Sequence, residues 1–135
     1  MYLHEDKGLF FDVVNAASEK LNIPMAVIEK DYYVTMILKL FSSKSENCVF
    51  KGGTSLSKCF HLLDRFSEDI DITFTEHLGE GRRKTLKYKI LRPISEELGL
   101  PISNWEKSKV TRIITAIFLH TIHWTVMWKK ACIRE

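Results

Sequence analysis

A short apolar run that stops at two adjacent glycines constrains this sequence more than any other feature. Cys48–Phe50 is too short for a helix and is typical of a buried strand, and Gly52-Gly53 ends it in a tight turn. A helix is expected over Thr54–Leu63, with these side chains on its buried side: Leu56, Cys59, Phe60 and Leu63. The chain should therefore contain a strand–turn–helix unit built around the glycine pair.

A second strand is predicted downstream of this unit. Asp69–Phe74 alternates strictly between polar and apolar residues, which indicates a half-buried strand. Residues two apart on a strand share a face, so Asp69 and Asp71 should stand side by side with Ile70 and Ile72 buried behind them. Neighbouring carboxylates repel, and Mg²⁺ offsets that repulsion well because it prefers carboxylate and phosphate oxygens. Asp69 and Asp71 are therefore candidate metal ligands and catalytic residues.

The glycine turn suits a phosphate group. Glycines let the backbone approach a bulky anion, and the amides at the start of a helix favour negative charge. Thr54 and Ser55 add hydroxyl donors, although the segment lacks the spacing of a P-loop. Together the two motifs suggest a site in which backbone amides and hydroxyls hold a triphosphate beside metal-bound carboxylates.

Helical spacing of apolar residues predicts helices over Glu5–Leu21, Pro24–Phe41 and Arg82–Leu98, and Pro93 is expected to kink or split the last of them. The segment Val110–Val126 is rich in β-branched residues and favours a strand. This order of elements indicates an α/β or α+β fold. The first two helices are expected to turn these side chains inward: Leu9, Phe10, Val13, Val14, Ala17, Leu21, Val27, Ile28, Val34, Ile37, Leu38 and Phe41.

Composition bounds the class of protein. The length of 135 residues suits one domain, which we divide into a helical lead-in (1–45), a core (46–108) and an atypical tail (109–135). With 45% hydrophobic and 27% charged residues, disorder is not expected. Three cysteines without metal-ligand spacing argue against a zinc or disulfide scaffold, and no signal peptide is recognisable, so we expect a cytoplasmic protein. The most apolar stretch, 110–128, is interrupted by Arg112 and is not expected to span a membrane.

The segment Phe50–Phe74 resembles the nucleotidyltransferase superfamily signature, a Gly-Gly or Gly-Ser turn followed by Asp-x-Asp on the next strand. More narrowly, GGTSL followed by RFSEDID, with IEKDYYV upstream at Ile28–Val34, resembles the AbiEii/AbiGii toxin family. The resemblance implies a nucleotidyltransferase-fold core, a small mixed sheet with flanking helices and two leading N-terminal helices. It implies phosphate binding by Gly52, Gly53, Thr54 and Ser55, Mg²⁺ binding by Asp69 and Asp71, and supporting roles for Lys30, Asp31, Arg65 and Ser67.

The function implied by the resemblance is transfer of a nucleoside monophosphate from NTP to an acceptor hydroxyl. RNA, including tRNA ends, is the expected acceptor, and the protein would be the bacterial toxin of a toxin–antitoxin or abortive-infection system, with a cognate antitoxin. A protein hydroxyl or an aminoglycoside-like molecule is an alternative acceptor.

A non-catalytic reading stays open beside this one. Members of the family are longer than this chain and supply a third acidic residue from their later part, which implies truncation at the C-terminus. No acidic residue occurs between Lys107 and Lys130. The alternative is therefore a non-catalytic remnant, or a nucleotide-binding module that lacks the third carboxylate.

Several basic residues permit two interpretations. Arg82–Lys84, Lys87 and Lys89 could face RNA, although such runs are more often a solvated helix face. Lys51 and Lys58 could contact phosphate or remain solvated. The net charge of +3 permits contact with nucleic acid without arguing for it.

Overall fold

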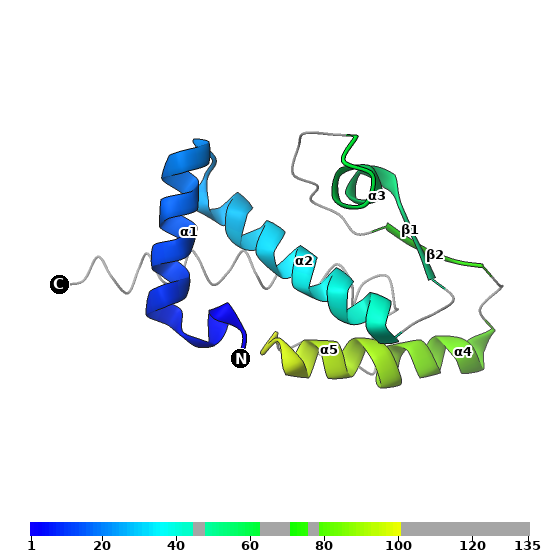
Figure 1. Ribbon diagram of the computed structural model, residues 1–135. Coiled ribbons are helices and arrows are strands. Elements are labelled where there is room, and N and C mark those ends of the chain that lie inside the picture. The colour runs from blue at the N-terminus through cyan, green and yellow to red at the C-terminus, as the bar shows by residue number, and fades with distance from the viewer. Residues whose placement is uncertain (45–47, 63–70, 76–78, 101–135) are drawn as a thin grey trace.

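The computed structural model describes residues 1–44, 48–62, 71–75 and 79–100, which form a helix-dominated α+β arrangement (Figure 1). Two of its strands pair in an antiparallel sheet. The strand expected within Val110–Val126 lies outside the described residues. In chain order the elements are η1 (Leu3–Glu5), α1 (Lys7–Leu21), α2 (Met25–Lys44), β1 (Cys48–Lys51), α3 (Gly52–Lys58), β2 (Asp71–Phe74), α4 (Glu80–Thr85), the π-helical turn η2 (Leu86–Leu91) and α5 (Arg92–Glu97).

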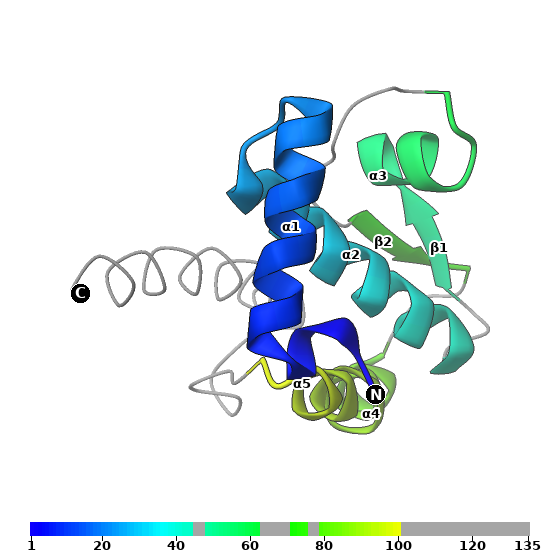
Figure 2. The same ribbon diagram turned by 60° about the vertical axis from the view of Figure 1, so that its left-hand side comes forward.

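Helix α2 lies in the middle of the molecule. Figure 1 and Figure 2 show α1 crossing its N-terminal half, the continuous helix α4–η2–α5 along its C-terminal half, and the sheet with α3 on its remaining side. The predicted second helix is therefore confirmed, although it extends beyond Phe41 to Lys44. The position of α2 makes it the element to which the others attach.

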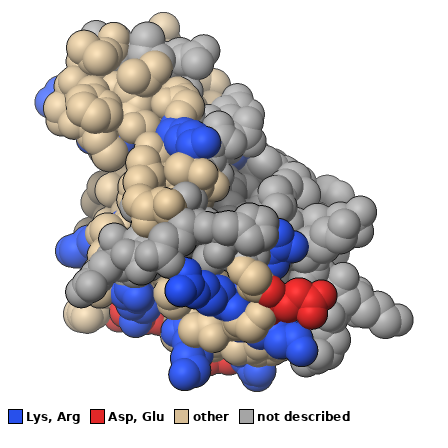
Figure 3. Space-filling model, turned by 90° about the vertical axis from the view of Figure 1, so that its right-hand side faces the viewer, with Lys and Arg blue, Asp and Glu red and all other residues tan. Residues whose placement is uncertain are grey.

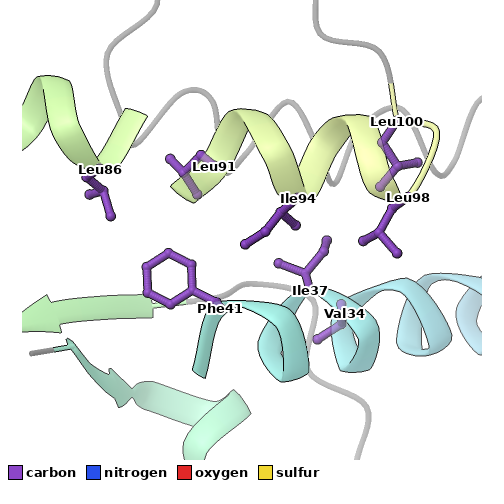
Figure 4. Close-up of a cluster of buried hydrophobic side chains, with 8 residues drawn as sticks. All are labelled: Val34, Ile37, Phe41, Leu86, Leu91, Ile94, Leu98 and Leu100. Carbon is purple, nitrogen blue, oxygen red and sulfur yellow. The ribbon is translucent and has the colours of Figure 1, made fainter. Parts of the chain in front are cut away.

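The core forms between α2 and the continuous helix α4–η2–α5, which we call the late helix. Val34, Ile37 and Phe41 recur at helical spacing and are all buried, as predicted, because they share one face of α2. Figure 4 shows this face turned towards the late helix and the two leucines at its end. The partners of the three side chains are Leu86, Leu91, Ile94, Leu98 and Leu100.

The two strands attach to this core through one pair of side chains. In the antiparallel register Phe50 of β1 lies opposite Ile72 of β2, and both pack against the core cluster. The Phe50 ring meets the Phe41 ring edge-on, with centroids 6.1 Å apart. The predicted strand over Cys48–Phe50 is confirmed, but Val49 is 44% exposed, so β1 is covered on one face only.

Pro93 does not end the last helix. The chain changes from α to π geometry over Leu86–Leu91 and returns to α geometry at Arg92. The Arg92 amide donates to the Lys87 carbonyl five residues earlier, which widens the turn that precedes the proline ring. The predicted break is therefore a local change of helix type, because a wider turn relieves the proline clash of a regular α-helix.

Two predicted apolar faces are wrong. On α1, Leu9, Val13 and Leu21 are about half exposed, with Val14 buried, because α1 crosses α2 and buries only the part that touches it. In the helix predicted over Thr54–Leu63, these expected core residues are exposed: Leu56 on α3, and Cys59 and Phe60 just after it.

The bounds of α1 and α3 also differ from the predictions. Helix α1 begins at Lys7 because the Asp6 side chain accepts a hydrogen bond from the Leu9 amide at 3.0 Å and caps it. Helix α3 ends at Lys58, and His61 follows with a φ of 52° in the left-handed region, which a continuing helix does not allow. Within the described residues, no helix combines the length and apolarity that a membrane crossing requires.

Truncation of Leu91 tests this core. Leu91 is 1% exposed, so Leu91→Ala should lower the free energy of unfolding by about 2–5 kcal/mol. Leu9→Ala removes the same atoms from a residue that is 52% exposed and should cost less than about 1 kcal/mol. Urea titrations of both variants measure the difference, and equal losses would show that the core lies elsewhere.

Candidate functional site

The glycine pair joins β1 directly to α3. Lys51 ends the strand in an extended conformation, with φ −124° and ψ −178°, and Gly52 turns the chain with φ 67°. An L-residue with a side chain avoids this region because its Cβ crowds the backbone, whereas glycine enters it at little cost. Gly52 is therefore required by the turn, and the strand-to-helix turn predicted from the sequence is confirmed.

The strand register brings the second motif to the same turn. Asp71, the first residue of β2, pairs with Lys51, the last residue of β1. Paired Cα atoms of an antiparallel sheet lie roughly 5 Å apart, so the backbone of Asp71 lies beside the glycine turn. The two motifs are therefore neighbours at one end of the sheet. These predicted residues lie outside the described part of the chain: Arg65, Ser67 and Asp69.

The hydroxyl residues follow the glycines within α3. The backbone of Thr54 belongs to the first turn of the helix. Ser55 is 8% exposed, and its carbonyl accepts hydrogen bonds from the amides of Cys59 and Phe60, which close the C-terminal end of the helix. Ser55 therefore lies inside the strand-to-helix unit, and phosphate binding by Thr54 and Ser55 stays a prediction.

A salt bridge joins α3 to α2. Lys58, the last residue of α3, donates a hydrogen bond to Oδ2 of Asp31, which lies 27 positions earlier in the sequence. Both side chains are largely buried, with 28% of Lys58 and 19% of Asp31 exposed. Oδ1 of Asp31 is buried and has no hydrogen-bond partner within the described residues. Lys58 is therefore a paired residue rather than a solvated lysine, and Asp31 is directed at α3.

The residues next to Asp31 in the sequence contact other elements of the fold. Tyr32 Oη lies 2.9 Å from Nδ1 of His4 in η1, and the Tyr33 ring packs against His4 and Phe10. Burial, and then the charge of Glu29, raise the pKa of Tyr33 to about 12, while burial lowers the pKa of His4. Lys30, on the same turn of α2, is half-buried. One turn of α2 thus fixes both α3 and the N-terminal helices.

A cavity of about 390 Å³ lies between η1, α1, α2 and the end of α5. Its walls are mainly apolar and include Phe10, Val14, Tyr33 and Leu100, together with the buried Glu29. None of the residues predicted to bind nucleotide or metal lines it. The cavity is therefore distinct from the glycine turn.

The cation site predicted at the glycine turn would be formed by the Asp-x-Asp motif, Asp69 and Asp71. Among the described residues, no group of three or more His, Cys, Asp or Glu side chains is placed to hold a metal ion. Of the two predicted ligands, Asp71 is described in its backbone and Asp69 is not described. The metal site at this turn therefore remains a sequence-based prediction.

The chain matches a known protein family. A family model described as "Nucleotidyl transferase AbiEii toxin, Type IV TA system" matches residues 37–116, which is more than half of the chain. The match begins in α2 and includes the glycine turn, β2 and the helix α4–η2–α5. No curated protein and no solved structure gave a match.

Replacement of Gly52 tests the turn. Gly52→Ala should lower the free energy of unfolding by about 1–2 kcal/mol, because alanine is strained at this positive φ. Gly81→Ala is the matched control, since a Cβ at Gly81 meets open space within α4 and alanine is the better helix former. Thermal or urea unfolding distinguishes the two, and a Gly52→Ala variant as stable as the control would contradict the turn.

Removal of Lys58 tests the salt bridge. Lys58→Met leaves the carboxylate of Asp31 largely buried without its cation and should cost about 1–3 kcal/mol. Adding Asp31→Asn should recover part of that loss, because an amide needs no counterion. Lys20→Met on the surface of α1 is the control and should be neutral. If the double variant is no more stable than Lys58→Met in urea titrations, the pair does not couple the two helices.

Proposed function

The chain belongs to the AbiEii nucleotidyl transferase toxin family of type IV toxin–antitoxin systems, and from this premise we propose that it transfers a nucleoside monophosphate from NTP to an acceptor hydroxyl. The observation that carries the proposal is the pairing of Lys51 with Asp71. This register sets the start of the Asp-x-Asp motif's strand beside the glycine turn. A triphosphate at the turn would therefore lie next to the carboxylates proposed to hold Mg²⁺, and the metal would offset the charge of the phosphates.

The glycine turn is proposed as the phosphate-binding element. Gly52 and Gly53 lack side chains that would keep a phosphate from the backbone. Gly52 also has the positive φ that the strand-to-helix turn requires. Thr54 and Ser55 complete the proposed phosphate contacts. In this arrangement the turn orients the triphosphate, so that the acceptor oxygen can approach the α-phosphorus opposite the pyrophosphate leaving group.

Asp69 and Asp71 are proposed to hold Mg²⁺. Two carboxylates at strand spacing are hard oxygen donors and fit this cation, which also binds phosphate oxygens. The packing of Ile72 on the core is consistent with a strand that is buried on one face, as the alternating sequence predicts. When bound, the metal would neutralise charge that develops on the phosphates during transfer.

The proposed reaction exchanges a phosphoanhydride linkage of NTP for a phosphoester linkage to the acceptor. The acceptor hydroxyl oxygen forms a bond to the α-phosphorus of NTP, and the bond from that phosphorus to the pyrophosphate oxygen breaks. The proton of the acceptor hydroxyl is released. The residues of this chain bind and orient the triphosphate, and Asp31 positions the turn by holding Lys58 at the far end of α3. Lys30, Arg65 and Ser67 are proposed as further supporting residues.

RNA, including tRNA ends, is the acceptor that we propose for a toxin of this family. A cognate antitoxin would then limit its effect, as the family's assignment to toxin–antitoxin systems suggests. We place the reaction in the bacterial cytoplasm, where NTP is available and where an exposed free thiol such as that of Cys59 stays reduced.

Magnesium-dependent NTP binding tests the proposal. Isothermal titration calorimetry on the full chain should show NTP binding that requires Mg²⁺. Asp69→Asn with Asp71→Asn should weaken this binding at least about tenfold, because each amide removes a charge that the metal needs. The matched control is Asp12→Asn with Glu19→Gln, which removes two carboxylates from the exposed surface of α1.

Two outcomes would contradict the proposal. If the chain does not bind NTP, the non-catalytic remnant is the correct reading. If both double variants bind NTP equally well, the carboxylates do not serve the nucleotide. Where binding behaves as expected, transfer of labelled NTP to total RNA measures the activity itself.

A further inference from the structure

The positive charge of this chain is concentrated in one segment. Between Gly79 and Arg92 the sequence carries six basic residues and one acid, a net charge of +5, whereas the whole chain carries +3. The remaining residues together are therefore net negative. These are the six: Arg82, Arg83, Lys84, Lys87, Lys89 and Arg92.

Most of these side chains lie on the surface. All but Lys87 are exposed, and Figure 3 shows Lys and Arg side chains gathered over the lower part of one side of the molecule, where α4 lies in Figure 1. Lys87 is buried, with its amino group 5.3 Å from the centre of the Tyr88 ring. Arg92 pairs with Glu96 at 2.9 Å. We leave Arg92 aside and call the other exposed residues, Arg82, Arg83, Lys84 and Lys89, the basic face.

The composition of the basic face favours a polyanion in water over a membrane. A helix that binds a membrane surface inserts large apolar residues beside its basic ones. Within the described residues, no exposed large hydrophobic side chain lies between Gly79 and Leu100. A surface of Arg and Lys without apolar residues fits the phosphate backbone of a nucleic acid.

The position of the basic face suits an acceptor of some length. β2 begins at Asp71 beside the glycine turn and runs to Phe74, from which the chain continues to α4 (Figure 1). Four strand residues span about 10 Å, so the basic face lies beyond the opposite end of the sheet from the turn. A polynucleotide is long enough to lie along both places.

We propose that the basic face binds the sugar–phosphate backbone of the RNA acceptor while the acceptor hydroxyl reaches the glycine turn. RNA binding by the basic face stands on the charge distribution, and its role in transfer rests on the proposed function. Contacts of this kind are independent of sequence and release counterions, so binding should weaken steeply with salt.

The test measures binding of a fluorescein-labelled single-stranded RNA to the full chain by anisotropy, between about 50 and 200 mM KCl. Arg83→Gln with Lys84→Gln removes two charges from the basic face. It should weaken binding about tenfold at the lowest salt and reduce the slope of log K against log salt by about 1.4. Lys7→Gln with Lys20→Gln removes two charges from α1, at the other end of the molecule, and should leave the slope unchanged (Figure 1).

Equal slopes for the two double variants would overturn the proposal, because the charges would then act only through the net charge. Binding to phosphatidylglycerol vesicles that depends on Arg83 and Lys84, without RNA binding, would overturn it in favour of a membrane. Calorimetry with Mg²⁺ and NTP separates the two proposals. Intact NTP binding by Arg83→Gln/Lys84→Gln shows a folded turn, and RNA binding that persists without NTP binding leaves the basic face in place while the transfer function fails.

Discussion

The side chain of Phe41 packs against both the helical core and the sheet. It is fully buried, it belongs to the cluster between α2 and the late helix, and its ring meets Phe50 of β1. Because side chains alternate along a strand, fixing Phe50 inward fixes the register of the whole hairpin, and a slip by one residue would turn every side chain to the other face. The pairing of Lys51 with Asp71, and with it the candidate site, follows from this contact.

The glycine turn and the upstream segment Ile28–Val34 meet in space through α2. The glycine turn opens α3, and Lys58 at the end of α3 bonds to Asp31 on the central helix. The next two residues of the same helix turn contact η1 and α1 through their rings. A residue far upstream of the turn, Asp31, thus contacts the helix that the turn begins.

The spacing of apolar residues predicted where the helices and strands lie better than it predicted which of their side chains are buried. The buried face of α2 and the strands β1 and β2 follow from the local spacing of apolar residues, which can be read directly in the sequence. The exposure of Leu9 on α1 and of Phe60 after α3 could not be predicted, because spacing shows that a helix has an apolar side but not how much of it a neighbour covers. Local spacing also did not indicate the left-handed residue His61 or the π geometry before Pro93, where the proline predicted only a kink or a split. The salt bridge between Asp31 and Lys58 joins residues too distant in sequence for any local pattern to indicate.

The central helix α2 contacts both the strand-to-helix unit, where we propose that the nucleotide binds, and the helix that carries the basic face. Paramagnetic broadening of amide signals in a ¹⁵N–¹H spectrum by Mn²⁺ with ATP tests the proposed nucleotide binding most directly, because Mn²⁺ can replace Mg²⁺ among oxygen ligands. The account predicts selective loss of the Gly52, Gly53 and Asp71 signals, while Ala16 on α1 stays sharp. Broadening centred on Glu29 and the cavity beside it, with the turn unaffected, would contradict the central claim.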